Sequence, residues 1–248
     1  KGRSKSFDRL ERINSIIEDG FPLTTLPEWF PNLKRNTRRW SEVVYLINYA
    51  LGKGKFRFSG ERDKFDYLFD QGGMGVPFRS LSDGYKAFLG WVTDLLYHLH
   101  SVSVATDKSL REIEGIVLVD EIDLHLHPVW QMEVIERLSD TFPRLQFILT
   151  SHSPLIAGSV EWMNITPLRL SNMHRSRVVP FEQSTYGLDA DQILVSELFG
   201  LDSTRARFKR DRLRELKTRA RHGDNDAAKR LLAELSRGLL EKDEDDSH

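Results

Sequence analysis

The stretch from Gly115 to His127, GIVLVDEIDLHLH, constrains the fold of this chain more than any other. Four consecutive apolar residues, Ile116 to Val119, run directly into the acidic pair Asp120 and Glu121. An unbroken apolar run of this kind is typical of a strand that is covered on both faces, as in the middle of an α/β sheet. The two carboxylates then fall at the carboxyl end of the strand, where open α/β sheets bind their ligands.

A carboxylate pair in this place suits a divalent cation and a hydrolytic water. A hard cation such as Mg²⁺ needs oxygen ligands, and an attacking water needs an acceptor for its proton. Asp120 is the candidate for the metal, and Glu121 is the candidate for the water. A plain strand followed by a solvated polar turn has the same pattern, so the rest of the chain has to discriminate between the two.

Composition leaves room for one large domain or two small ones. At 248 residues, 40% of them hydrophobic, the chain can bury a sizeable core. The formal net charge is −1, so nucleic-acid binding has to come from local patches. The absence of cysteine excludes disulfides and thiolate metal sites. Because there is no long apolar run and the amino end is polar and basic, we expect a soluble, cytoplasmic protein without a membrane partner.

A second apolar segment, Leu145 to Thr150, leads into Ser151-His152-Ser153-Pro154. Between the two apolar segments, Pro128 and the helical spacing of the apolar residues after it predict a helix. This strand–helix–strand order predicts two neighbouring parallel strands. His152 is therefore expected beside Glu121, at the same edge of the sheet.

Upstream of both strands, Leu81-Ser82-Asp83-Gly84-Tyr85-Lys86 opens a helix with a strongly apolar face. Ser82 or Asp83 can cap this helix, and Gly84 lets the backbone of its first turn come close to a ligand. The free amides of the first turn and the positive end of the helix dipole favour an anion, and the Ser82 hydroxyl adds a donor. An ordinary capped helix explains the same residues.

The apolar spacing predicts further short elements around this core. Asp189 with Gln192 resembles a capping box that opens a helix running through Phe199. The helix predicted over 205–221 is densely basic, and an acidic tail follows over 241–246. The other predicted elements are helices over 1–19 and 41–51 and short strands over 165–170 and 177–181.

Two glycine-containing segments look like phosphate loops, but neither satisfies that motif. Gly52-Lys53-Gly54-Lys55 is followed by Phe56 and has no apolar strand before it, so we interpret it as a basic turn. The glycines at 72, 73 and 75 lack the required lysine and hydroxyl, and we expect them in a loop. The chain therefore contains no phosphate loop.

Taken in order, these motifs resemble those of the ABC-type ATPases, and within them the AAA family ATPases related to RecF, SMC and OLD proteins. LSDGYK is similar to the ABC signature and IVLVDE to a Walker B strand with its catalytic glutamate. DLHLHP is similar to the D-loop region, and TSHSP to the switch histidine. The resemblance is strong over 78–158. The segment 184–203 resembles, more loosely, the carboxyl-terminal part of bacterial ATPases found in phage-defence operons.

The fold class implied by the resemblance is α/β: an ABC-type ATPase lobe with parallel β-strands flanked by helices, plus a helical accessory region. Residues 1–77 would form a helical and irregular segment, 78–182 the ABC-like core, and 183–248 a carboxyl-terminal helical region. In this family a phosphate loop and a Q-loop precede the signature, and this chain has neither. Either this chain is the carboxyl-terminal part of a longer protein, or another chain supplies the missing lobe, and Lys1 at the beginning of the chain favours the first. On its own, the chain is expected to bind ATP weakly and to hydrolyse it negligibly.

The resemblance also implies a site with ATP and Mg²⁺ as cofactors. Asp120 would hold Mg²⁺, Glu121 would polarise the attacking water, and His152 would contact the γ-phosphate. The signature would bind ATP held by a second protomer, so the protein is expected to form a homodimer or higher oligomer through the ATP site. Phosphoryl transfer depends mainly on positioning and charge neutralisation, so a split site couples hydrolysis to assembly. The implied ATP-binding residues of the signature are Ser82, Gly84 and Lys86.

The function implied is an ATPase that regulates a nucleic-acid-directed effector, such as a nuclease, in antiphage defence. A DNA-repair or chromosome-maintenance ATPase of RecF or SMC type and a non-catalytic partner-binding lobe are the alternatives. Asp123, His125 and His127 alternate and would share one side of a strand, as in a metallohydrolase, although no second cluster supports that class. No convincing Glu plus Asp-x-Asp arrangement follows His152, so a built-in Toprim nuclease is not expected. The basic helix over 205–221 either binds DNA or RNA, docks an acidic partner, or is simply solvated.

Overall fold

The structure is a computed structural model that describes residues 22–35, 37–52, 56–64, 66–170, 175–204 and 207–236. The chain divides into two compact units, Lys1–Leu188 and Asp189–His248. The helix predicted over 1–19 and the acidic tail over 241–246 lie outside the described residues. In the part of the chain that the structure describes, no helix is both long and apolar enough to cross a membrane.

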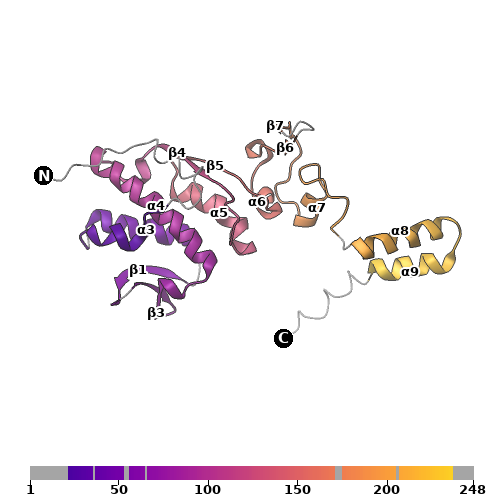
Figure 1. Cartoon of the computed structure of the whole chain (residues 1–248), viewed down its shortest axis with the longest axis horizontal. Coiled ribbons are helices and arrows are strands. Elements are labelled where there is room, and N and C mark those ends of the chain that lie inside the picture. Colours follow the sequence, from indigo (N-terminus) through magenta and orange to yellow (C-terminus); the bar gives the residue numbers. More distant parts are fainter. Residues whose placement is uncertain are drawn as a thin grey trace. The chain divides into compact units, whose positions relative to one another are not determined.

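The core of the first unit is built on two long helices, α3 (Arg38–Leu51) and α4 (Asp83–Thr106) (Figure 1). α3 begins earlier than predicted because Thr37 caps it, its hydroxyl accepting a hydrogen bond from the Trp40 amide at 3.4 Å. The helix ends at Gly52, whose φ of 73° suits a residue without a Cβ. A short helix, α2 (Leu26–Trp29), and the 3₁₀ turn η1 (Phe30–Asn32) add buried aromatic residues to the same core.

An antiparallel sheet that the sequence analysis does not predict packs on α3. Asn48 of α3 holds its first strand, donating to the Phe58 carbonyl at 3.0 Å and accepting from the Phe58 amide at 2.7 Å. The prediction of a glycine loop is wrong for Gly75, which lies in a strand, whereas Gly72 and Gly73 form the hairpin turn with φ of 61° and 90°. The three strands are β1 (Arg57–Arg62), β2 (Tyr67–Gln71) and β3 (Met74–Pro77).

The predicted strand–helix–strand unit is confirmed as β4 (Gly115–Val119), α5 (Pro128–Thr141) and β5 (Leu145–Leu149). The two strands are parallel neighbours, paired in register from Gly115 with Leu145 to Val119 with Leu149. Pro128 occupies the first turn of α5, as predicted. The carboxyl ends of both strands therefore lie at one edge of the sheet.

Only one face of this two-stranded sheet is covered, which corrects the prediction that its first strand is buried on both faces. On the covered face, Val119, Phe147 and Leu149 pack against the core. The opposite face is apolar but open, with Ile116 66% exposed, Leu118 47% exposed and Ile148 51% exposed. In the described part of the chain, this face is therefore largely accessible to solvent.

After β5 the chain forms shorter elements than predicted. α6 (Pro154–Gly158) follows directly, and a small antiparallel hairpin comprises β6 (Leu168–Leu170) and β7 (Ser176–Val178). The remaining 3₁₀ turns of the unit are η2 (Phe78–Ser80), η3 (Leu110–Glu112) and η4 (Trp162–Asn164).

The second unit contains α7 (Ala190–Leu194) and a helical hairpin of α8 (Arg207–Arg221) and α9 (Asn225–Ser236), whose two helices lie side by side (Figure 1). The predicted capping box of Asp189 and Gln192 is present. The prediction that this helix runs through Phe199 is wrong. The Ser196 hydroxyl donates to the Ile193 carbonyl at 2.6 Å, a local bond that competes with a continuing helix.

Candidate active site

The acidic turn after β4 and the polar loop after β5 lie next to each other. Thr150 joins them: its hydroxyl accepts a hydrogen bond from the Glu121 amide at 2.8 Å and donates one to Asp120 Oδ1. Its carbonyl accepts from the Ile122 amide at 3.0 Å, so the two strands stay connected one residue beyond the sheet. In the sequence, Thr150 is only the last residue of a predicted strand, and its position next to Ser151-His152-Ser153 is the signal that could have identified it as part of the site.

Glu121 has an unusual backbone that sets the direction of its side chain. Its φ of 49° lies in the left-handed region, which non-glycine residues seldom occupy. Residues held in such conformations cluster at functional sites, where the surrounding structure maintains them. Here the Leu124 amide donates to the Glu121 carbonyl at 2.9 Å, and the Thr150 hydroxyl holds the Glu121 amide. The carboxylates of Asp120 and Glu121 are both exposed at this edge.

His152 lies beside the acidic turn, as predicted. Its backbone amide donates to Asp123 Oδ1 at 3.4 Å, and the residue as a whole is exposed. Gln131 of α5 reinforces the same junction, because its side chain donates to the Leu126 carbonyl at 2.9 Å and accepts from Ser153 Oγ at 2.7 Å. The loop after β5 is thus fixed to both the acidic turn and α5.

The alternating residues Asp123, His125 and His127 do not form a metal cage. Among the described residues there is no group of three or more His, Cys, Asp or Glu side chains that could hold a metal ion. Asp123 instead accepts from the loop after β5, and His127 caps α5, its Nδ1 accepting from the Val129 amide at 3.4 Å. These hydrogen bonds explain the positions of Asp123 and His127, and no catalytic metal is needed to explain them.

A magnesium ion that binds together with a phosphate needs fewer protein ligands than a catalytic metal held by the protein alone. Mg²⁺ keeps several waters and is usually held by one or two carboxylates together with substrate phosphates. Asp120, whose exposed carboxylate lies at the end of a parallel strand, can supply one such ligand. Its orientation is supported by the Thr150 hydroxyl.

The signature segment forms the beginning of α4. Ser82 occupies the position before the first turn, as predicted, but its side chain makes no capping hydrogen bond and is exposed. Lys86 lies one turn further on, with its Nζ 3.3 Å from Asp83 Oδ1. The hydroxyl that the sequence analysis assigns to a ligand is therefore not used to cap its own helix.

The backbone of Gly84 lies close to another segment of the same chain, the turn after β4. A Cβ built on Gly84 would lie 2.4 Å from the carbonyl oxygen of His125, well inside van der Waals contact. His125 has a φ of 64°, again in the left-handed region, so its carbonyl is held by the turn after β4. The sequence predicts that this glycine approaches a ligand. In the structure it allows the beginning of α4 to pack directly on the acidic turn.

An aromatic cluster extends this contact between α4 and α5. The rings of Tyr85 and Trp130 are 4.5 Å apart and those of Phe88 and Trp130 are 5.2 Å apart, both edge to face. The Arg137 guanidinium lies 5.3 Å from the Trp130 ring. Burial raises the pKa of the Tyr85 hydroxyl, and Arg137 opposes that shift only in part, so the phenol stays neutral at physiological pH.

The turn of residues 120–127 is thus the meeting point of the three predicted motifs. On one side it carries Asp120 and Glu121 beside the loop that contains His152. On the other side, through His125, it contacts the beginning of α4 at Gly84. Motifs that are far apart in the sequence occupy one continuous surface region around the carboxyl edge of the sheet.

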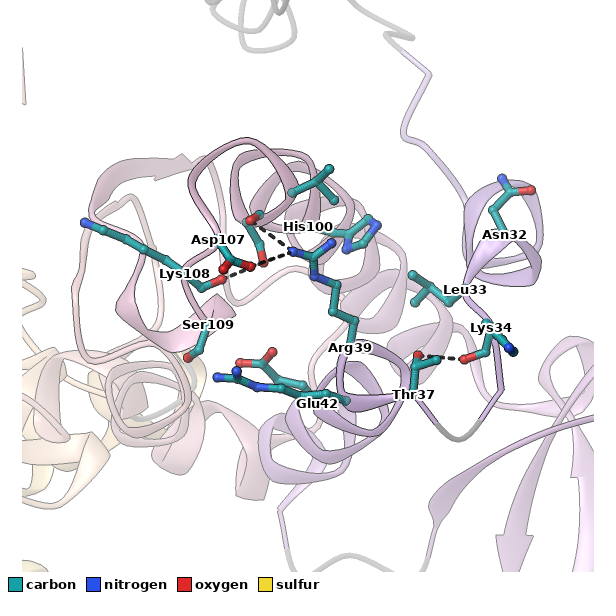
Figure 2. Close-up of a pocket in the computed structure, with 13 residues that line it drawn as sticks. Asn32, Leu33, Lys34, Thr37, Arg39, Glu42, His100, Asp107, Lys108 and Ser109 are labelled. Carbon is teal, nitrogen blue, oxygen red and sulfur yellow. Dashed lines mark hydrogen bonds and ion pairs between the residues drawn. The ribbon is translucent and has the colours of Figure 1, made fainter.

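A cavity of about 450 Å³ lies elsewhere in the first unit, between the start of α3 and the end of α4, and none of the predicted site residues lines it. Figure 2 shows Arg39 bridging it, with its guanidinium 3.3 Å from the Ser103 carbonyl and 3.7 Å from Asp107. Burial and the Arg39 charge lower the pKa of His100, whose ring stacks on Trp29 at 6.0 Å. We interpret this cavity as a structural junction between two helices.

Parallel strands that end in an acidic pair and a polar loop, next to the start of a long helix, define an α/β lobe that binds its ligand at the carboxyl edge of the sheet. Comparison with known families agrees with this class. The chain belongs to the family described as "AAA domain, putative AbiEii toxin, Type IV TA system", whose model matches residues 9–158.

Named relatives match parts of the chain. A "Septu protein PtuA" of Bacillus mycoides (strain KBAB4) is 28% identical over 200 residues, which cover 78% of this chain and 26% of that protein. The "Retron Ec83 probable ATPase" of Escherichia coli is 37% identical over 123 residues, 49% of this chain and 22% of the relative. The "Retron Vc95 probable ATPase" of Vibrio cholerae serotype O1 biovar El Tor is 41% identical over 95 residues, 38% of this chain and 18% of the relative. The chain thus spans about a quarter or less of each of these three proteins.

Proposed function

We propose that this chain forms one part of an ATP-hydrolysing protein, with the reacting phosphates bound at the carboxyl ends of β4 and β5. The observation that carries the proposal is the hydrogen-bonded junction at which Thr150 links Asp120 and Glu121 to the loop of His152. Membership of an AAA family and relatives named as probable ATPases support the same reaction.

In this proposal each side chain has a separate task. Asp120 holds Mg²⁺ directly or through water, and the ion neutralises charge on the phosphates. Glu121 accepts the proton of the attacking water, and His152 donates to the γ-phosphate. Thr150 acts through Asp120 and Glu121, because its hydroxyl donates to an Asp120 carboxylate oxygen and accepts from the Glu121 backbone amide.

A further lobe, carrying the phosphate loop, completes the site. The uncovered face of the β4–β5 sheet supports this part of the proposal, because parallel sheets are normally covered on both faces. Ile116, Leu118 and Ile148 present an apolar surface that favours burial against another layer. The lobe belongs either to the same polypeptide or to a second chain, and the greater length of the relatives is compatible with the first arrangement.

The beginning of α4 contacts the ATP of a second protomer in this scheme. Ser82 offers a hydroxyl that is not used as a cap, Lys86 supplies a positive charge, and the first-turn amides favour an anion. Because Gly84 packs on His125, a movement of the signature is transmitted to the turn that carries Glu121. ATP then closes a homodimer or higher oligomer, and hydrolysis reopens it.

The biological role that we propose is antiphage defence, in which the ATPase regulates an effector such as a nuclease that acts on nucleic acid. The support is the resemblance of residues 184–203 to ATPases of phage-defence operons. Relatives that are named as Septu and retron proteins fit the same proposal.

The test is Glu121→Gln in the protein that includes the phosphate-loop lobe. ATP affinity should be retained, and the turnover number should fall about 10²- to 10⁴-fold, the usual contribution of a general base. Glu136→Gln, an exposed carboxylate on α5, is the matched control and should leave turnover unchanged. Equal turnover in the Glu121→Gln variant and the parent protein would remove Glu121 from the reaction.

A further inference from the structure

The α8–α9 hairpin of the second unit has a buried apolar seam. Leu213 and Leu216 of α8 and Ala227 of α9 are buried where the two helices pack. Leu213 and Leu216 lie in this seam, and over 211–221 the exposed side chains of α8 are charged or carry a hydroxyl. A helix of this composition is either solvated or bound to an anion.

The acidic residues of the hairpin neutralise some of its basic residues. Arg212 pairs with Glu234 of α9 at 3.2 Å. Arg219 pairs with Asp224 at 2.8 Å and lies 3.9 Å from Glu215. Hydrogen bonds from the first turn of α9 and from Arg219 lower the pKa of Asp224, so this carboxylate is committed to capping α9 and to that arginine.

Among the α8 side chains that the structure describes, over 211–221, three other cations remain outside these pairs. Arg214, Lys217 and Arg221 are exposed, and within the residues that the structure describes no ion pair to them is found. Their spacing of three and four residues places them on one face of the helix. The basic stripe that they form extends for about 10 Å along the helix axis.

We propose that this basic stripe binds the phosphate backbone of nucleic acid without reading its sequence. A row of cations at steps of about 5 Å matches a partner whose charges are also spaced along a line, as in a nucleic-acid strand. A protein partner would be expected to meet aromatic or aliphatic anchors at the centre of its interface. The described apolar side chains on α8 are instead directed into the hairpin seam. The stripe lies in the second unit and does not depend on the ATPase site.

The experiment compares the parent protein with the triple variant Arg214→Ala, Lys217→Ala, Arg221→Ala. Binding to a fluorescent DNA duplex of about 20 base pairs is followed by anisotropy at several salt concentrations. If all three cations contact phosphates, the slope of log K against log salt becomes shallower by about 2.7 in the variant. The three contacts alone weaken parental binding about 40-fold between about 50 and about 200 mM salt. Single-stranded DNA and duplex RNA, tested in parallel, identify the preferred backbone.

The control variant Lys34→Ala, Arg57→Ala, Lys64→Ala removes the same charge from exposed positions in the first unit. It should bind like the parent, and circular dichroism should show that both variants keep their helices, since alanine is a strong helix former. The proposal is overturned if no nucleic acid binds at low salt, if both triple variants weaken binding equally, or if polyglutamate binds as well as DNA. Retained ATP turnover in the stripe variant would show that nucleic-acid binding by the stripe and ATP hydrolysis at the β4–β5 edge are independent of each other.

Discussion

Gly84→Ala tests the contact between the signature helix and the acidic turn. The added Cβ would lie 2.4 Å from the His125 carbonyl oxygen, whereas ordinary contacts of a Cβ begin near 3.4 Å. The neighbour is backbone, and neither α4 nor the turn can move away by rotating a side chain. A shift of about 1 Å in one of them is therefore required, and overpacking of this kind costs about 1–3 kcal/mol.

Gly90→Ala on the same helix provides a matched control, because a Cβ at Gly90 would have no neighbour within 4 Å. Alanine is favoured over glycine by about 1 kcal/mol in a helix interior, where Gly90 lies, and by no more than that in the first turn, where Gly84 lies. Helix propensity therefore does not offset the cost of overpacking at Gly84. The difference in unfolding free energy between the two variants should be about 1–3 kcal/mol, with Gly84→Ala the less stable.

Urea unfolding of both variants, followed by circular dichroism, measures this difference. In the protein with its phosphate-loop lobe, Gly84→Ala should also lower ATP turnover, since the displaced turn carries Glu121. Equal stability of the two alanine variants would show that α4 does not press on His125. Our explanation of this glycine would then be refuted.

Three further outcomes are expected. His152→Ala should fold normally, because the residue is exposed on a loop, and should lower the turnover number; unchanged turnover would reduce His152 to a structural residue. Thr150→Val keeps the shape of the side chain but removes the hydroxyl that bonds to Asp120 and to the Glu121 amide. This variant should lower ATP turnover with little change in ATP affinity, and it should cost about 1 kcal/mol of stability. Full activity in this variant would exclude a positioning role for Thr150. Because burial lowers the pKa of His100 in the folded state, the unfolded state binds the proton more readily, and stability should decline as pH falls below about 6.5, the ordinary pKa of histidine. This decline should be smaller in His100→Phe, as measured by urea unfolding across that range, and identical pH profiles would contradict it.

The elements that the sequence predicts well are those whose signals are local. The apolar runs of β4 and β5, Pro128 at the start of α5 and the capping box at Asp189 each act over a few residues, and each is found. The β1–β3 sheet escapes prediction because its strands are short and half-buried. Its position depends on Asn48 of α3, which bonds to Phe58, ten residues further along the chain.

The candidate site is predictable only in part, for the same reason. Parallel pairing of two predicted strands is enough to place His152 beside the acidic pair. The contact of Gly84 with His125 joins residues that are distant in the chain, and no local pattern identifies it. The open face of Ile116 and Leu118 is equally invisible in sequence, because an apolar run has the same composition whether one or both faces are covered.

The central claim, that ATP closes two copies of the protein around the signature and the acidic turn, can be tested by cross-linking. This chain contains no cysteine, so cysteines introduced at the exposed Asp83 in one copy and at the exposed Leu124 in the other are specific markers. In the Glu121→Gln background, with the phosphate-loop lobe present, a short bismaleimide should join the two copies when ATP and Mg²⁺ are added and should fail to do so without nucleotide. Cross-linking that is absent with ATP, or equally strong without it, would contradict a nucleotide shared between two protomers.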